Sequence, residues 1–380
     1  MKRTIRGLMW VMLSTALVVM APRAFAQRPP ETHPVSTHQD IVLSWDRSAL
    51  PGDVEIQAPR TLIAYDHLDV GRQYGALHLV CESNSDSRRG ACPTEGDDRF
   101  LVGLHELRLT FKESRSQATL ELAVLGGVQR AMSGRACLGD FWQNGQYAPW
   151  SSYGVPCASD IPVGTGYQLH LPAKEVEKLV AGTWTASLSL ELRSPSTKNL
   201  ATFSYELSFT VTDHNAVAIY FPQFDEIAPH VGMNLRYDPI AHTIGGGTTV
   251  DMCLYDGLGS QAAYLGVTVR DSGARAPGPL GFSAWHRDSG GSGDSERLDY
   301  TVTLDHNGAQ VPMRNGVEEQ LTGIDSARLK LVLLPGMSQP VFCVPTPLRL
   351  EMPRVPIAEK QPGYYRGDLK VELRVPTGVP

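Results

Sequence analysis

The last strand-like stretch of the sequence constrains the fold more than any other feature. Its apolar residues alternate without a break with charged ones, and this apolar set is Leu369, Val371, Leu373 and Val375. Strict period-two alternation is typical of a β-strand with one buried and one solvated face. Since only five residues follow Val375, we expect a sheet edge whose neighbour comes from another molecule. Periodicity alone also allows an ordinary C-terminal strand that is already paired within its own domain.

The first 26 residues have the pattern of a secretory signal peptide. Basic residues precede an apolar run from Leu8 to Met20, and an Ala-Phe-Ala cleavage site ends at Ala26. A retained N-terminal anchor is the alternative, although the run is short for a membrane span. We therefore expect a mature chain that begins at Gln27 and leaves the cytoplasm.

The composition of the mature chain excludes some partners and indicates a fold class. Without the four basic residues of the signal peptide, 30 basic residues stand against 40 acidic ones, a formal net charge of −10. This balance argues against nucleic acid as a partner. About 350 mature residues predict two domains. Frequent Gly and Pro, without long helical periodicity, predict an all-β protein.

All six cysteines lie in the mature part, where an even number in an exported chain indicates disulfides. Their spacing favours two local pairs, Cys81 with Cys92 and Cys137 with Cys157, which leaves Cys253 with Cys343. A zinc site is the rival interpretation, but no C-x-x-C pair supports it. We therefore expect three structural disulfides and no metal.

Strand patterns follow one another from Ile41 to Thr212, interrupted by one short helix predicted over 172–181. The pattern pauses at residues 212–215 and a new apolar run begins at Ala216. We therefore expect an N-terminal domain over 27–213 and a C-terminal domain over 214–380, joined by a very short linker and placed end to end. In the second half, Asn307-Gly308 and Asn315-Gly316 predict hairpin turns.

The sequence carries no recognisable catalytic or cofactor motif. His105-Glu106 lacks the second His of a zinc protease, and there is no G-x-S-x-G elbow. Gly245-Gly246-Gly247 leads into no helix with a Lys, so we expect a glycine bend before a strand at Thr249. Asp97 and Asp98 are expected in a solvated turn. The interpretation is a protein that is no enzyme and needs no cofactor, with a secreted hydrolase as the alternative.

Several segments, in order along the chain, resemble the minor tip subunits of class 5 fimbriae, the CblD-like pilus initiators that include the CfaE-type colonization-factor adhesins. The strongest is the V-D-M-C-L-Y-D-G stretch ending at Gly257. The weaker ones are Gly90–Pro93, Leu169–Gly182, Ile219–Phe224, Asn234–Arg236 and Gly363–Val375. Together they cover nearly the whole mature chain.

This resemblance implies two β-sandwich domains: an adhesin-type N-terminal domain and an immunoglobulin-like pilin domain that lacks its last strand. The implied partners are a periplasmic chaperone that lends a strand, an outer-membrane usher, and the major pilin, whose N-terminal extension replaces the chaperone strand. The groove edge would be formed by Leu369, Val371, Leu373 and Val375. The protein would then sit at the fimbrial tip.

The segment Gln27–Gln39 has three prolines and almost no alternation, so it would serve poorly as a donor strand. This indicates a chain-terminating subunit rather than one in mid-fibre. A host-cell receptor is a further implied partner, but the arginines with which the family holds carbohydrate do not match here. Arg193 and Lys198 are the candidates for receptor binding, and a solvated hairpin tip is the alternative. A self-contained exported β-sandwich binding module also remains open.

Overall fold

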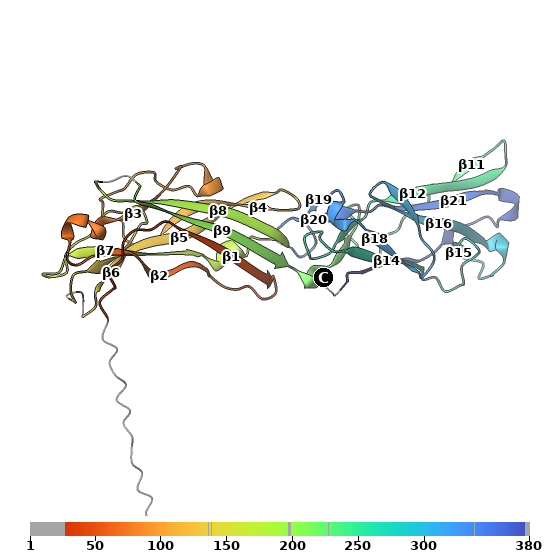
Figure 1. Cartoon of the computed structure of the whole chain (residues 1–380). Helices are drawn as coiled ribbons and strands as arrows, with labels where there is room; N and C mark the ends of the chain where they lie inside the picture. The colour runs from red at the N-terminus through yellow and green to blue at the C-terminus, as the bar shows by residue number, and fades with distance from the viewer. Residues whose placement is uncertain are drawn as a thin grey trace, which may run out of the picture.

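The computed structural model describes residues 27–135, 137, 139–196, 199–226, 228–337 and 339–376. The predicted signal peptide lies outside these residues. Two domains built almost entirely of strands lie end to end (Figure 1), which confirms the all-β prediction. Within the described part of the chain, no helix is long and apolar enough to cross a membrane.

The first domain is built on a nine-stranded sheet of order β1-β9-β8-β4-β5-β7-β2, with β3 on β8 and β6 on β5. Its strands alternate more and less buried residues, as in β9, where every second residue from Ala201 onward is buried. The strands are β1 (Thr37–Asp46), β2 (Val54–Tyr65), β3 (His78–Cys81), β4 (His105–Glu113), β5 (Thr119–Met132), β6 (Trp142–Tyr147), β7 (Pro162–Leu171), β8 (Gly182–Arg193) and β9 (Ala201–Thr212).

The predicted helix over 172–181 is wrong in length, because α1 (Ala173–Val176) is a single turn. Beyond it the backbone closes tighter i→i+3 bonds, with Leu179 N–H donating to Val176 O at 3.1 Å. This turn still buries the apolar stripe of Val176, Leu179 and Val180. The stripe needed burial, which a short turn provides as well as a helix does.

The second domain distributes its strands over three sheets. Two hold β10-β13-β20-β19 and β18-β14-β23, and the largest has the order β11-β12-β21-β16-β15-β22 with β17 on β16. The strands are β10 (Ala218–Tyr220), β11 (Arg236–Asp238), β12 (Thr243–Val250), β13 (Cys253–Tyr255), β14 (Tyr264–Asp271), β15 (Phe282–His286), β16 (Arg297–His306), β17 (Ala309–Pro312), β18 (Glu318–Thr322), β19 (Lys330–Val332), β20 (Val341–Pro345), β21 (Leu348–Pro356), β22 (Tyr365–Arg366) and β23 (Leu369–Arg374).

The two predicted hairpin turns have different outcomes. Asn307 and Gly308 both have positive φ, of 54° and 78°, and join the paired strands β16 and β17. This is the conformation that an Asn-Gly hairpin turn requires. Asn315-Gly316 instead connects β17 to β18, which belong to different sheets, so the hairpin prediction is wrong there. This turn instead forms a hydrogen bond with β14, in which the Gly316 N–H donates to Val269 O at 2.8 Å.

The three glycines Gly245, Gly246 and Gly247 lie inside β12 rather than in a bend before a strand, which corrects the sequence-based expectation. A bulge interrupts the pairing of β12 with β21 next to Gly246. A Cβ atom on Gly246 would lie 2.5 Å from the backbone oxygen of Asn234. The glycine therefore lets the chain before β11 cross closely over the sheet.

Three disulfides join Cys81 to Cys92, Cys137 to Cys157 and Cys253 to Cys343, which are the pairs that the spacing favoured. The third lies at the junction of the domains. Its cysteines pack into the core of the first domain together with Tyr255 and Val341. A continuous apolar core therefore spans the junction.

Polar contacts add to this shared core. The Arg115 side chain donates to the backbone oxygen of Ile324 at 3.3 Å and also to that of Ala327. Asp213 N–H donates to Gly257 O at 2.7 Å. The domains are thus held by apolar packing and by hydrogen bonds to backbone oxygen atoms.

A substitution of Gly259 tests how tightly the junction is packed. The φ of Gly259 is +70°, and an added Cβ atom would lie 2.6 Å from Gly182 Cα of the first domain. Gly308 is a matched control, because its φ is +78° and its Cβ atom would meet nothing within 4 Å. Since backbone strain costs about 1 kcal/mol, Gly308→Ala should lower the free energy of unfolding by about that amount. Gly259→Ala should lower it by about 2–4 kcal/mol, because the domains must also move apart.

Urea unfolding followed by circular dichroism measures both free energies. Equal losses of unfolding free energy in the two variants would show that the added Cβ atom of Gly259→Ala causes no steric cost at the junction.

Candidate functional site

The last strand of the second domain, β23, has a partner on one side. It pairs antiparallel with β14, from Leu369 opposite Asp271 to Arg374 opposite Gly266. Among the residues that the structure describes, no strand pairs with its other side, which we call the open edge. The unpaired backbone N–H and C=O groups of such an edge are a template for strand addition.

The apolar face of β23 is incompletely covered. Leu369, Val371, Leu373 and Val375 all pack against the core of the second domain, yet each remains partly exposed. These are the four residues that the sequence assigned to a groove edge, and the structure brings them to one face of β23 and its continuation. Partial exposure of a whole alternating set indicates that one layer of cover is lacking.

The last strand of the first domain, β9, provides an internal comparison. It is paired on both sides, antiparallel with β8 and parallel with β1. Its inward side chains are at most 5 % exposed, and they are Ala201, Phe203, Tyr205, Leu207, Phe209 and Val211. Two similar alternating strands thus differ in burial because one of them has a second neighbour.

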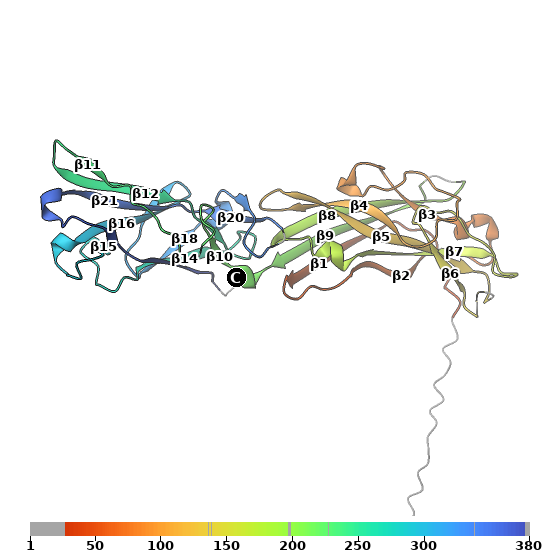
Figure 2. The same cartoon turned by 180° about the vertical axis from the view of Figure 1, so that it is seen from behind.

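A second border of the same core is also incompletely covered. The chain from β10 to β11 contributes partly exposed apolar side chains to it, namely Ile219, Phe221, Phe224, Val231 and Met233. This chain starts close to the junction and ends at the far end of the domain, as Figure 2 shows from the positions of β10 and β11. Both sets of side chains therefore leave the same core incompletely covered.

The outward face of β23 is held by ion pairs. Arg374 Nε donates to Glu318 Oε2 on β18 at 2.8 Å, and Lys370 Nζ lies 2.6 Å from Glu372 Oε1. The hydrogen bond from Arg374 keeps the pKa of the Glu318 carboxyl below its usual value. A Cβ atom on Gly266 would lie 2.7 Å from this carboxyl, so the glycine of β14 makes room for the pair. These contacts hold β23 in register, and they involve none of the side chains on its apolar face.

The structure places one of the two candidate receptor-binding residues. Arg193 ends β8, and its side chain is 17 % exposed. It lies 2.7 Å from Glu191 and 3.2 Å from Glu95, and it donates to Thr94 O at 2.9 Å. The hydrogen bond that Arg193 donates to Glu191 is the largest cause of the raised pKa of Arg193. Lys198 lies outside the described residues.

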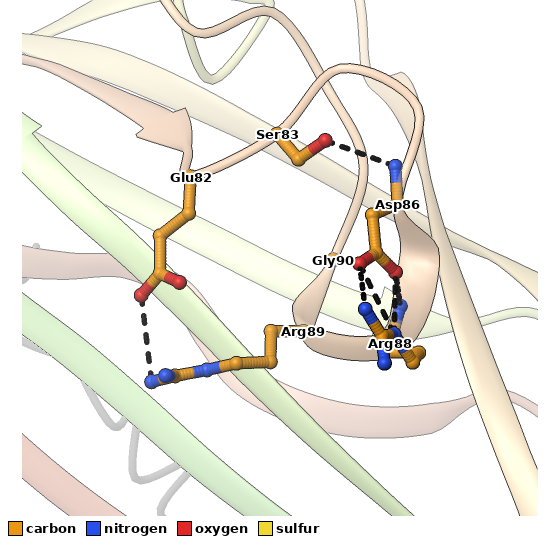
Figure 3. Close-up of a pocket in the computed structure, with 6 residues that line it drawn as sticks. All are labelled: Glu82, Ser83, Asp86, Arg88, Arg89 and Gly90. Atoms are coloured by element: carbon orange, nitrogen blue, oxygen red, sulfur yellow. Dashed lines mark hydrogen bonds and ion pairs between the residues drawn. The ribbon is translucent and has the colours of Figure 1, made fainter.

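The loop closed by Cys81 and Cys92 forms a polar hollow of about 350 Å³ (Figure 3). Its charged side chains are Glu82, Asp86, Arg88 and Arg89, as the sticks in the figure show. Arg88 lies 2.6 Å from Asp86 and Arg89 lies 3.4 Å from Glu82, so both guanidinium groups are paired inside the loop. Charged residues in a loop carry no signal in the sequence that they enclose a hollow, so the sequence did not predict this one.

The described residues contain no group of three or more His, Cys, Asp or Glu side chains placed to hold a metal ion. His105, the start of the incomplete zinc-protease motif, lies on β4 with its ring against Trp150, at 5.5 Å between centroids. Asp97 is paired with Arg99, whose hydrogen bond lowers the pKa of Asp97 to about 2. These residues serve local structure, and the open edge is the stronger functional candidate.

Two family models and a relative of known identity match most of this chain. CfaE is a subunit of the CFA/I fimbria, and the family model of its first domain matches residues 22–214. The family model of its second domain matches residues 217–377. The CFA/I fimbrial protein CfaE of Escherichia coli is 27 % identical, over 78 % of this chain and 80 % of that protein.

Solved structures extend the likeness to the fold. The crystal structure of CfaE, the adhesive subunit of the CFA/I fimbria of enterotoxigenic E. coli, has a TM-score of 0.69 and 25 % identity, over 92 % of this chain and 95 % of the other. A chaperone–tip adhesin complex of CFA/I fimbria biogenesis has a TM-score of 0.67 and 24 % identity, over 92 % of this chain and 99 % of the other. The resemblance seen in the sequence is thereby confirmed, and the chain belongs to the CfaE family of fimbrial subunits.

Proposed function

We propose that this protein is the tip adhesin of a chaperone–usher fimbria and that it initiates assembly by accepting a donor strand at the open edge of β23. The observation that carries the proposal is the partly exposed apolar face of β23, compared with the buried face of the doubly paired β9. A donor strand would supply both the missing hydrogen bonds and the missing apolar cover.

The partners follow from this role. A periplasmic chaperone would lend the strand first, the outer-membrane usher would receive the complex, and the N-terminal extension of the major pilin would replace the chaperone strand. The mature chain would thus pass through the periplasm to the cell surface. The relative solved as a chaperone–tip adhesin complex supports the first of these partners.

A position at the tip is supported by how the N-terminal segment is used. Thr32 forms a bridge with Tyr65, and the chain continues into β1, which lies parallel to β9 from Thr37 to Asp46. This segment therefore seals its own domain. A subunit in mid-fibre needs such a segment free to fill the next subunit.

Adhesion would belong to the first domain, and we infer that its role is binding rather than catalysis. Arg193 and Lys198 stay the proposed receptor contacts. Because the donors of Arg193 are engaged by Glu191, Glu95 and Thr94, a receptor would have to compete with these groups. The E. coli relative CfaE is the adhesive subunit of its fimbria, which supports adhesion as the function of this chain.

Thermal unfolding tests strand acceptance. The mature chain should be compared with a version in which the N-terminal donor peptide of the major pilin follows Pro380. Each buried apolar side chain contributes about 1.5–3 kcal/mol, so several of them should raise Tm by roughly 10 °C or more. Hydrogen exchange should slow most at β23 and at residues 219–235. A stable monomer whose Tm the peptide leaves unchanged would point to a self-contained binding module instead.

A substitution on the apolar face of β23 should cancel the rise in Tm that the donor peptide produces. Val371→Asp places a carboxylate where a donor side chain would pack, so we expect it to remove most of the peptide-dependent rise in Tm. Val42→Asp is the matched control, because Val42 lies on the edge strand β1 and is 74 % exposed. The quantity to compare is the difference in Tm with and without peptide, since Val371→Asp also weakens the domain itself. An equal peptide effect in both variants would contradict donor packing against Val371.

A further inference from the structure

Exposed apolar side chains gather at the end of the second domain that points away from the first. The hairpin of β11 and β12 carries Ile240 and Tyr237, which are 91 % and 48 % exposed. Ile357, 43 % exposed, is joined to this hairpin, because its N–H donates to His242 O at 3.0 Å. Figure 1 shows the β11–β12 hairpin and the turn after β21 together at this far end.

Tyr364 belongs to the same end but to the other edge of the sheet. It is 72 % exposed and directly precedes β22, which pairs with the end of β15. Its backbone oxygen accepts the Arg287 N–H at 2.7 Å, and the Arg287 guanidinium lies 5.0 Å from its ring centroid. Tyr364 is thus separated from the hairpin, and we call only Tyr237, Ile240 and Ile357, which lie around His242, the end surface.

The hairpin tip is ordered independently of the exposed side chain that it carries. The Asp238 carboxylate accepts the N–H groups of Ile240 and Ala241 at 3.0 and 3.1 Å. Tyr237 Oη lies 2.9 Å from His242 Nδ1 across the turn. Ile240 itself contributes almost nothing to the core, so an isoleucine at this position gains nothing from folding. Exposed apolar groups that gather in this way mark an interaction surface.

The two incompletely covered borders of the core both reach this end. The chain after Met233 runs into β11, and β23 is entered from Tyr364 through β22. The opposite end of β23 lies toward the junction. Arg374 pairs with Gly266 at the start of β14, and the chain just before β14 contacts the first domain through Gly259 and Gln261. There the shared core and the bonds of Arg115 join the second domain to the first.

A strand that occupies the open edge can therefore connect to a folded body at the far end, since the first domain blocks the junction end. The N-terminal extension of a pilin is joined to the folded body of that pilin at the C-terminal end of the extension. An extension bound at the open edge would therefore run from the junction to the far end, antiparallel to β23. The body of the donor then lies against the end surface. This step rests on the strand acceptance proposed above.

We propose that the end surface is a second docking site for the subunit that donates the strand and that it contacts the folded body of that subunit. Strand insertion then provides the main attachment, and the apolar contact at the far end adds affinity and orients the next subunit. Ile240 is the central contact, because a fully exposed aliphatic side chain on an ordered turn can enter a pocket at little entropic cost.

The test separates the donor strand from the donor body. Two probes are bound to the mature chain held in its chaperone complex: the isolated N-terminal peptide of the major pilin, and the whole major pilin with its own groove filled by a fused strand. Ile240→Asp and Ile357→Asp alter the end surface. Leu68→Asp is the matched control, since Leu68 is 79 % exposed on the first domain.

We expect Ile240→Asp and Ile357→Asp each to weaken binding of the whole pilin about tenfold and to leave peptide binding unchanged. Leu68→Asp should change neither. Unchanged binding of the whole pilin by both variants would overturn the docking site while leaving strand acceptance intact. If the two variants weaken chaperone binding and leave pilin binding unaltered, the end surface belongs to the chaperone, and the proposed docking site for the pilin is overturned as well. If the peptide fails to bind the unmodified chain, strand acceptance itself fails and the docking site with it.

Discussion

The cover that neighbouring strands give to apolar strand faces is the constraint on which this structure depends. In the first domain β1 closes β9, and the inward side chains of β9 are buried. In the second domain β23 has β14 on one side, and its inward side chains stay partly exposed. The two strands thus differ by one neighbouring strand, and only the strand with a neighbour on each side has a fully covered apolar face.

The junction turns two domains into one rod. Cys253 and Cys343 belong to the second domain, yet they pack into the core of the first. Close approaches such as that of Gly259 to Gly182 leave no room for sliding. A tip subunit transmits force from the fibre to whatever its first domain holds, and a continuous apolar core transmits it without a flexible linker.

The sequence predicted the succession of strands between Ile41 and Thr212, and it predicted the four apolar residues that lie on one face of β23 and its continuation. It failed where tertiary contacts replaced local preference. The helix over 172–181 shrank to one turn because burial of Val176, Leu179 and Val180 needs no longer helix. Asn315-Gly316 made no hairpin because its flanking strands belong to different sheets.

Period-two alternation, the paired cysteines and the family motifs are local properties of the chain, so the sequence by itself determined an all-β protein, the faces of its strands and the family. The tertiary structure alone decided which edge stays open, because pairing depends on strands far apart in the sequence, as β1 and β9 are. It likewise decided that Arg193 is held by Glu191 and Glu95 and that Ile240 projects from an ordered turn. Exposure and partnership are properties of the folded neighbourhood, and no stretch of sequence carries them alone.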